Sequence, residues 1–367
     1  MSVASLVEGK QVVICAGSGG VGKTTTSAAI AAGMAERGKK AAVLTIDPAR
    51  RLADSLGLRE LGNEARRVDP ARLRAAGLGE GELWALTLDA KRTFDDIVEA
   101  HAPDRQAREA ILSNPIYREL SNAVAGSQEY MAMEKLHELH QEGRYDLLVL
   151  DTPPTRNALD FLEAPARLSR FIDSRSLQFF RAGSRAGLGL VGRGTGVLFA
   201  VMKRATGVDL LDDLAGFFNS LGGMSEGFGE RAKRVNALLR DSRTTFLLVT
   251  SPRAASIEEA SYFSDKLADS GLPLGGVIVN RVRGQLAAKP TPALESELAR
   301  LLDEKLARKI VRNLDDHLRL ADRDARNVSE LRQRLGGSRP TIEVPELAGD
   351  VHDLNGLAGM NRYLFAA

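Results

Sequence analysis

The pattern G-x-x-x-x-G-K-T at residues 17–24 constrains this chain more than any other stretch of its sequence. Glycines at these spacings let successive backbone N–H groups converge on phosphate oxygens. Lys23 has the length to reach the β- and γ-phosphates, and the Thr24 hydroxyl can bind Mg²⁺. The pattern therefore predicts a site for a nucleoside triphosphate with its magnesium ion.

The residues on both sides of this pattern have the character that such a loop requires. Residues 11–16 form an apolar run rich in β-branched side chains, which is typical of a buried parallel strand. Residues 24–37 lack proline, are dominated by good helix formers and stop at Gly38, a residue suited to ending a helix. The sequence thus predicts the order strand, phosphate-binding loop, helix.

Composition excludes several classes of function. The chain has 367 residues and 44% hydrophobic content, enough for a large core. Its formal net charge is +2 with no dense basic block, so the sequence predicts no nucleic-acid partner. Cys15 is the one cysteine, which excludes an internal disulfide and a zinc site built on a cysteine pair, and which fits a reducing compartment.

The sequence predicts a cytoplasmic protein. The first eleven residues contain Glu8 and only short apolar pieces, unlike a secretory leader. The most hydrophobic later stretch, residues 186–202, is interrupted by Arg193 and several glycines, so it falls short of a membrane span.

Further apolar runs alternate with helical patterns along the chain. Strands are expected at residues 41–46, 84–88, 146–151, 246–250 and 277–280, and residues 89–142 are expected to be mainly helical. This alternation predicts an α/β fold with a doubly wound, mainly parallel sheet and an inserted helical subdomain. Asp47 and Asp151 follow or end two of the strands, at the sheet edge where such folds bind ligands.

The expected organisation has five segments. The nucleotide-binding core comprises residues 1–88, 143–165 and 241–367, with a helical segment at 89–142 and an apolar helical subdomain at 166–240.

Three motifs in sequence order carry a resemblance to a known family. Residues 17–25 resemble the deviant Walker A loop of the arsenical-pump and tail-anchored-protein-targeting ATPases. Residues 47–56 resemble the switch I segment of that family, and residues 151–159 its switch II segment. Residues 344–347 and the helical pattern after them resemble the loop beside adenine and the last helix.

The resemblance implies a P-loop NTPase fold, ATP and Mg²⁺ as ligands, and a role for each matching residue. Lys23 would bind phosphates, Thr24 and Asp151 would hold the metal, and Asp47 would orient or deprotonate the hydrolytic water. Asn280 would hydrogen-bond the adenine edge, and Pro345 would pack against the ring. The loop itself would be shaped by Gly19, Gly20, Val21, Gly22 and Thr25.

Ser18 departs from the family pattern, which has a second lysine that reaches across a dimer to the partner's phosphates. The loss leaves three alternatives: weak intrinsic hydrolysis, a heterodimer whose paralogue supplies the lysine, or replacement by an arginine. Arg50, Arg51 and Arg156 stand in the switch segments where the family has other residues, and Arg50 and Arg156 are the favoured replacements.

The middle of the chain suggests a hydrophobic partner. Apolar residues between 177 and 202 alternate with glycines, and residues 210–221 have the pattern of an amphipathic helix. In the targeting ATPases the corresponding region receives a transmembrane helix. Here it would bind a hydrophobic client or membrane protein, or pack as core or against a partner in a homodimer or a heterodimer with a paralogue.

Competing functions differ in what they require of the sequence. An arsenite pump needs several thiols, which one cysteine in a strand does not provide. A positioning ATPase of the MinD or ParA type is the runner-up, although the extra length lies inside this fold. A nucleotide-sensing regulator with little hydrolysis is the third possibility, and Ser18 favours it.

Overall fold

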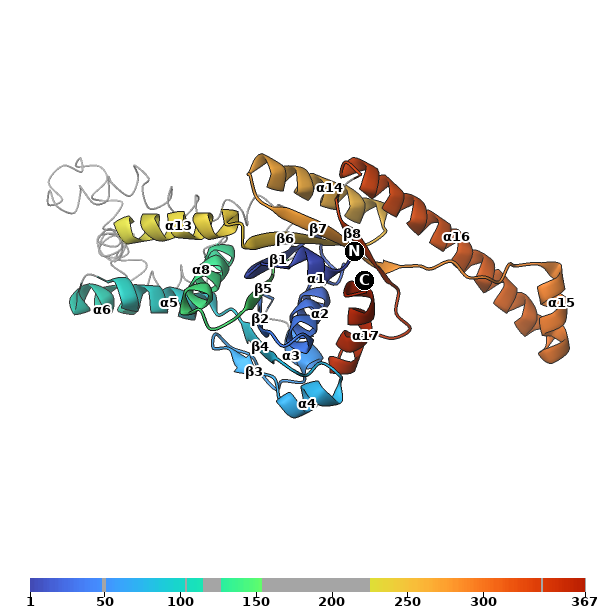
Figure 1. Ribbon diagram of the computed structural model, residues 1–367, viewed down its shortest axis with the longest axis horizontal. Coiled ribbons are helices and arrows are strands. Elements are labelled where there is room, and N and C mark those ends of the chain that lie inside the picture. The colour runs from blue at the N-terminus through green and yellow to red at the C-terminus, as the bar shows by residue number, and fades with distance from the viewer. Residues whose placement is uncertain (48–50, 103, 115–126, 154–224, 338, 367) are drawn as a thin grey trace, which may run out of the picture. The chain divides into compact units, whose positions relative to one another are not determined.

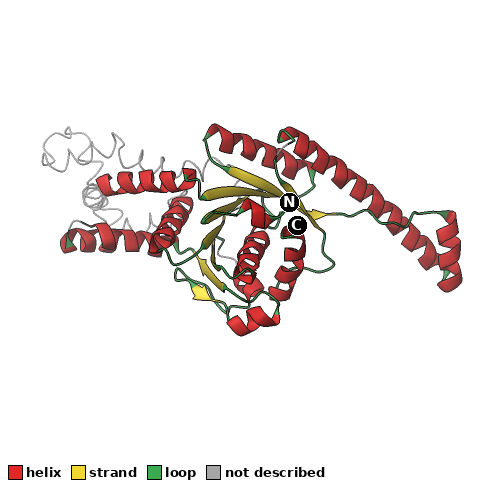
Figure 2. Ribbon diagram, viewed as in Figure 1, coloured by secondary structure: helices red, strands yellow, loops and turns green. Residues whose placement is uncertain are grey.

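The computed structural model describes residues 1–47, 51–102, 104–114, 127–153, 225–337 and 339–366 (Figures 1 and 2). The chain divides into two compact units. The first comprises Met1–Leu86, Glu142–Arg156 and Ser242–Ala367, and the second comprises Thr87–Gln141 and Asn157–Asp241. The glycine-rich loop belongs to the first unit.

The first unit is built on a mostly parallel sheet. Within the described residues the sheet has eight strands in the order β3-β4-β2-β5-β1-β6-β7-β8. Their bounds are β1 (Val12–Ala16), β2 (Lys40–Thr45), β3 (Arg66–Arg67), β4 (Glu82–Thr87), β5 (Leu147–Asp151), β6 (Thr244–Thr250), β7 (Leu274–Val282) and β8 (Thr341–Pro345). The short β3 is antiparallel to β4, whereas β1, β2, β5, β6, β7 and β8 pair in parallel.

Burial explains why the central strands read as continuous apolar runs. All residues of β1, β5 and β6 are buried, because helices cover both faces of a doubly wound sheet. Cys15 lies in β1 with no exposed surface. The edge strand β8 instead alternates between buried and less buried residues and ends at Pro345, which cannot donate to a further ladder.

Helices cover the sheet on both faces (Figure 1). The helices of this unit are α1 (Val3–Leu6), α2 (Lys23–Glu36), α3 (Arg51–Leu56), α4 (Pro70–Ala75), α14 (Ala254–Asp269), α15 (Pro292–Leu301), α16 (Glu304–Arg334) and α17 (Leu354–Leu364). Helix α2 packs on β1, β2, β5 and α17, and α14 packs on β6, β7 and α16 on the opposite face. Opposite faces are expected, because right-handed crossovers that leave the centre of the sheet in opposite directions cover opposite faces.

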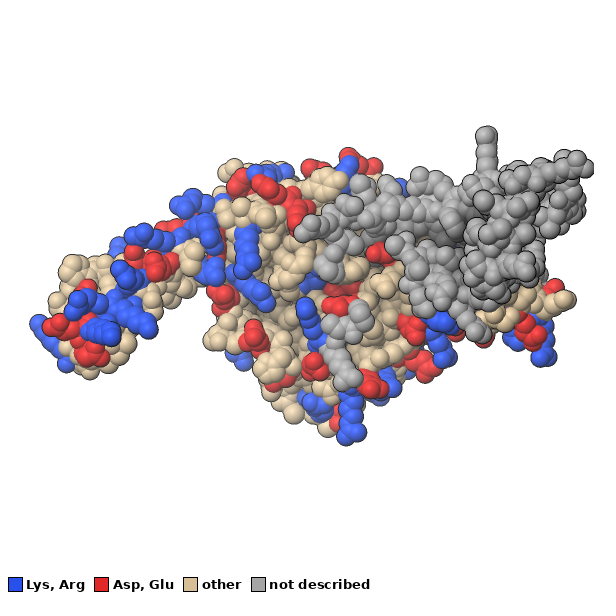
Figure 3. Space-filling model, turned by 180° about the vertical axis from the view of Figure 1, so that it is seen from behind, with Lys and Arg blue, Asp and Glu red and all other residues tan. Residues whose placement is uncertain are grey.

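Helix α16 is the longest described element, with 31 residues. It packs against α15, α14 and β7, and most of its buried residues lie in its C-terminal half. Lys and Arg side chains along these two helices are interspersed with Asp and Glu (Figure 3). A helix of mixed charge and strong amphipathic pattern buries one face and leaves the other in solvent.

The second unit is helical where it is described. Its helices are α5 (Ala90–His101), α6 (Arg105–Ser113), α8 (Ser127–Glu142) and α13 (Ser225–Arg240). An ion pair joins the half-buried Arg231 of α13 to the buried Glu134 of α8: Arg231 Nη2 lies 2.7 Å from Glu134 Oε2, and the Tyr130 hydroxyl donates to the same carboxylate. The expected amphipathic helix at 210–221 and the apolar stretch at 177–202 lie outside the described residues.

The predicted fold class is confirmed. The expected strands at 11–16, 41–46, 84–88, 146–151, 246–250 and 277–280 occur as β1, β2, β4, β5, β6 and β7, with shifted ends. The elements α1, β3 and β8 were not anticipated, because so few residues show no clear periodicity; of the residues expected to form the loop beside adenine, Val344 and Pro345 end β8. Among the described residues no helix combines the length and apolar character needed to cross a membrane.

Gly17 is required where β1 meets the loop. Its φ is +153°, and a Cβ at this position would lie 2.0 Å from the backbone oxygen of Val249 in β6. We therefore expect Gly17→Ala to lower the free energy of unfolding by about 1–3 kcal/mol, measured by chemical denaturation. Gly9→Ala is the control, because Gly9 also has positive φ but open space around it. Equal losses in the two variants would contradict a role for the Val249 contact.

Candidate nucleotide-binding site

The glycine-rich loop connects the carboxyl end of β1 to the first turn of α2. Gly22 caps α2 in a left-handed conformation with φ of 95°, and a Cβ there would lie 2.4 Å from Asn280 Nδ2. Helix α2 begins at Lys23, so its first N–H groups have no partner within the helix. Such a helix start attracts anions, above all phosphate.

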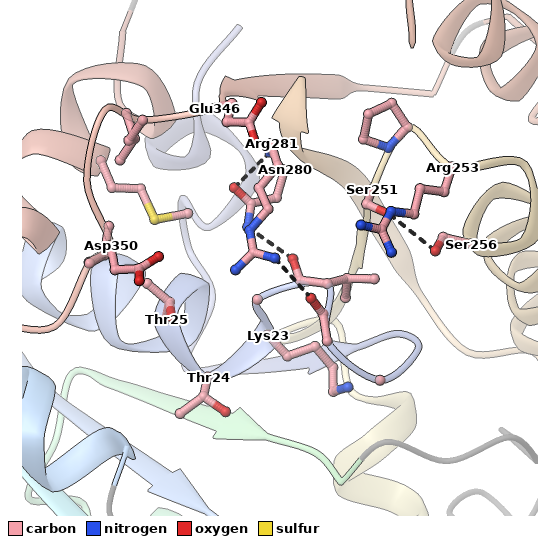
Figure 4. Close-up of a pocket in the computed structure, with 18 of the residues that line it drawn as sticks. Lys23, Thr24, Thr25, Ser251, Arg253, Ser256, Asn280, Arg281, Glu346 and Asp350 are labelled. Atoms are coloured by element: carbon pink, nitrogen blue, oxygen red, sulfur yellow. Dashed lines mark hydrogen bonds between the residues drawn. The ribbon is translucent and has the colours of Figure 1, made fainter. Parts of the chain in front are cut away.

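The loop forms the floor of a pocket of about 870 Å³ (Figure 4). Ten of the predicted site residues line it: Gly19, Gly20, Val21, Gly22, Lys23, Thr24, Thr25, Asp47, Asn280 and Pro345. They follow or end β1, β2, β7 and β8, so the pocket lies at the carboxyl edge of the parallel strands.

The Lys23 amine is held inside the loop. Its Nζ donates to the backbone oxygen of Ser18 at 2.8 Å, and only 7% of the residue is exposed. Burial lowers the pKa of Lys23, and the nearby carboxylates of Asp151 and Asp47 oppose that shift. A buried amine next to a neutral carbonyl gains strongly when a phosphate brings negative charge.

Asp151 lies beneath the pocket rather than on its wall. Its Oδ2 accepts hydrogen bonds from Thr24 Oγ1 at 2.6 Å and from Thr45 Oγ1 at 2.8 Å, and 1% of the residue is exposed. Burial raises the pKa of Asp151 to about 6, against the two threonine hydrogen bonds and Lys23, which lower it. Its Oδ1 is buried without a hydrogen-bond partner.

Thr45 connects the two predicted acids, Asp47 and Asp151. The sequence analysis did not predict this role of Thr45. Its hydroxyl donates to Asp151 and accepts from the backbone N–H of Asp47 at 3.2 Å. Asp47 itself lines the pocket. The one feature of the sequence that could have indicated this role is the hydroxyl of Thr45 at the end of a mostly apolar strand.

Asn280 fastens β7 to the loop. Its Nδ2 donates to the Val21 backbone oxygen at 2.9 Å, and its Oδ1 accepts from the N–H of Arg281 at 3.0 Å. Each end of the amide retains capacity for one further hydrogen bond, so these contacts are compatible with the predicted contact to adenine.

Several lining residues were not predicted. Ser251 and Arg253 come from the turn between β6 and α14, Ser256 lies in the first turn of α14, and Arg281 and Arg283 follow Asn280. Arg51 from switch I also lines the pocket. Arg50 and Arg156, the favoured replacements for the missing lysine, lie outside the described residues.

Arg283 ties the pocket wall to α16. Its Nη1 lies 3.1 Å from Oδ2 of the fully buried Asp324 in α16, and its Nε lies 3.1 Å from Glu346 Oε2 in the loop after β8. Because both acids engage the same guanidinium, Arg283 serves as a structural link between these elements.

Comparison with known proteins places these features in a family context. The sequence profile of the anion-transporting ATPase family matches residues 10–316. ATPase GET3 of Malassezia globosa is 26% identical over 273 residues, which cover 74% of this chain and 72% of that protein. ATPase get3 of Neurospora crassa is 26% identical over 289 residues (78% and 77% coverage), and that of Aspergillus terreus is 27% identical over 287 residues (77% and 76%). Since the family profile covers most of the chain, this protein belongs to the anion-transporting ATPase family of ATP-hydrolysing enzymes.

Proposed function

We propose that the protein binds Mg²⁺ and ATP in this pocket and uses hydrolysis to change the conformation of its helical unit. The observation that carries the proposal is that the glycine-rich loop, Lys23, Thr24 and Asp47 line one pocket beside the buried Asp151. In this proposal Lys23 leaves the Ser18 carbonyl and binds phosphate oxygens. Asp47, fixed by its N–H to Thr45, orients the attacking water and accepts its proton.

The residues around Thr24 fit a magnesium ion. Mg²⁺ prefers a few protein oxygens together with phosphate oxygens and water. Asp151 offers a buried, unpaired Oδ1, and the Thr24 hydroxyl lies 2.6 Å from the same carboxylate. When bound, the ion would supply positive charge to offset the negative charge of the phosphates. The Thr24 hydroxyl donates its proton to Asp151, so the lone pairs of its oxygen would be available to the ion, and Asp151 would keep its hydrogen bonds from Thr24 and Thr45.

We further propose that the output is the binding of a hydrophobic client, such as a membrane-spanning helix. The similarity to GET3 ATPases and the apolar, glycine-rich sequence between residues 177 and 202 support this proposal. Asp47 and Asp151 begin the two switch segments. Loss of the γ-phosphate would therefore first change the conformation of the residues that follow these two acids. A dimer of two copies, or a pair with a paralogue, would enclose such a client.

Client binding is tested with a fluorescent peptide of about 20 apolar residues, the length of one membrane span. We expect purified protein to hold this peptide to an extent that differs between ATP and ADP with Mg²⁺, as read by gel filtration and anisotropy. A peptide of the same length in which polar residues alternate with leucine is the control. If the protein hydrolyses ATP but holds neither peptide in any nucleotide state, the client proposal is wrong while the ATPase assignment stands.

A further inference from the structure

Arg281 has a backbone conformation that needs an explanation. Its φ is +62°, and it is the one residue other than glycine with positive φ in the described part of the chain. Side chains with a Cβ avoid this left-handed region because of steric crowding, and long side chains do not stabilise it by local hydrogen bonds. Such strained positions persist where the surroundings enforce them, often at ligand sites.

The surroundings that enforce it are visible around Asn280. The Asn280 Oδ1 accepts from the Arg281 N–H at 3.0 Å, while the Asn280 Nδ2 donates to the Val21 oxygen at 2.9 Å. The side chain of one residue therefore fixes both the phosphate-binding loop and the irregularity at Arg281, where the register between β7 and β8 shifts between Asn280 and Val282. At this irregularity the Arg281 side chain is directed from β7 toward the loop (Figure 4).

The Arg281 guanidinium lies at the exposed tip of the loop. Its Nη1 is 3.5 Å from the backbone oxygen of Gly20, a long and weak contact that leaves the other guanidinium N–H groups available. Arg281 is exposed, lines the pocket and has no carboxylate partner among the described residues. Arg283, two residues further on, differs because Asp324 and Glu346 already neutralise it.

The Arg281 guanidinium is a cation without a carboxylate partner beside a phosphate-binding loop, so a bound nucleotide is the ligand that its charge fits. We propose that Arg281 is a further nucleotide-binding residue, which closes over the bound ATP from the side of Asn280 and contacts it where the sugar meets the phosphates. The guanidinium would keep its contact with the Gly20 oxygen and donate to oxygen atoms of the nucleotide. It would thereby add positive charge at a loop in which position 18 is serine.

This inference rests on the proposed binding of ATP, and the test separates the two. The affinities of Arg281→Gly, Arg281→Lys and the wild-type protein for ATP are measured by calorimetry, together with the thermal midpoint of each protein without nucleotide. We expect Arg281→Gly to raise the Kd by at least about tenfold, the value of one charge-assisted hydrogen bond. Its thermal midpoint should equal or exceed that of the wild type, since glycine relieves the strained backbone. Arg281→Lys should raise the Kd by less than Arg281→Gly does, because the charge remains although the planar set of donors is lost.

Arg319→Ala is the matched control, since Arg319 is an exposed arginine of α16 that lines no part of the pocket. It should bind ATP as the wild type does. Unchanged affinity in Arg281→Gly, beside wild-type protein that binds ATP, would overturn the role of Arg281 and leave the proposed site intact. A large fall in the thermal midpoint of Arg281→Gly, together with the loss of affinity, would show a structural role and also overturn it. Absence of ATP binding by the wild-type protein would overturn the proposed function itself.

Discussion

Lys23→Ala is expected to lower the rate of ATP hydrolysis by at least about 100-fold, the effect of removing one principal donor to the reacting phosphate. Lys23 is 7% exposed and its amine lies inside the loop, 2.8 Å from the Ser18 oxygen, so neutral water does not compensate for the loss of its charge. Without this amine, less positive charge would offset the repulsion between the phosphates and the carboxylates of Asp47 and the buried Asp151. Phosphate release and nucleotide binding, measured on the same preparation, give the loss in turnover and in affinity.

Lys135→Ala provides the matched control for a buried lysine. Lys135 is also 7% exposed, but it lies in α8 of the other compact unit, where its Nζ pairs with Glu138 Oε1 at 2.7 Å. This variant should retain most of the activity at a temperature where it is folded. Similar turnover in Lys23→Ala and wild-type protein would contradict the placement of the triphosphate on this loop.

The unfolding free energy of Asp151→Asn is expected to rise, relative to that of the wild type, as the pH rises. Burial raises the pKa of Asp151 to about 6, above the ordinary value of 3.8 that applies in the unfolded chain. The wild type therefore has the full benefit of a neutral Asp151 below pH 3.8 and loses that benefit as the pH rises through 6. Asparagine stays neutral throughout. Between pH 4 and pH 7 the difference in unfolding free energy should shift in favour of Asp151→Asn by about 2 kcal/mol.

Denaturant unfolding without nucleotide or Mg²⁺ measures this shift. Asp146→Asn is the control, because Asp146 is an exposed carboxylate just before the opposite end of the same strand. If the difference in unfolding free energy between Asp151→Asn and the wild type stays constant across this pH range, the pKa of Asp151 is not raised in the folded protein. The same variant should lose Mg²⁺-dependent ATP binding, since it lacks the carboxylate proposed to hold the ion.

Sequence patterns predicted six of the eight strands in the described part of the chain and the order strand, glycine-rich loop, helix at its start. Apolar runs predicted the central strands because strands buried on both faces tolerate few polar residues. The role of Thr45 could not be predicted in this way, because its contact with Asp151 depends on β2 lying next to β5. The sequences of the two strands do not determine that they are neighbours. Arg281 escaped notice for a related reason. A single arginine near the end of a strand carries no signal until its φ and its distance to Gly20 are known.

The buried position of Cys15 makes the protein inert toward thiol reagents. Burial raises the pKa of Cys15 to about 12, so the reactive thiolate is almost absent at neutral pH. Because Cys15 is the one cysteine of the chain, cysteines introduced on the surface would be the sole targets for dyes or spin labels. One label in each compact unit would then report how far apart the units are in ATP and in ADP, on a protein that keeps every native residue of its pocket.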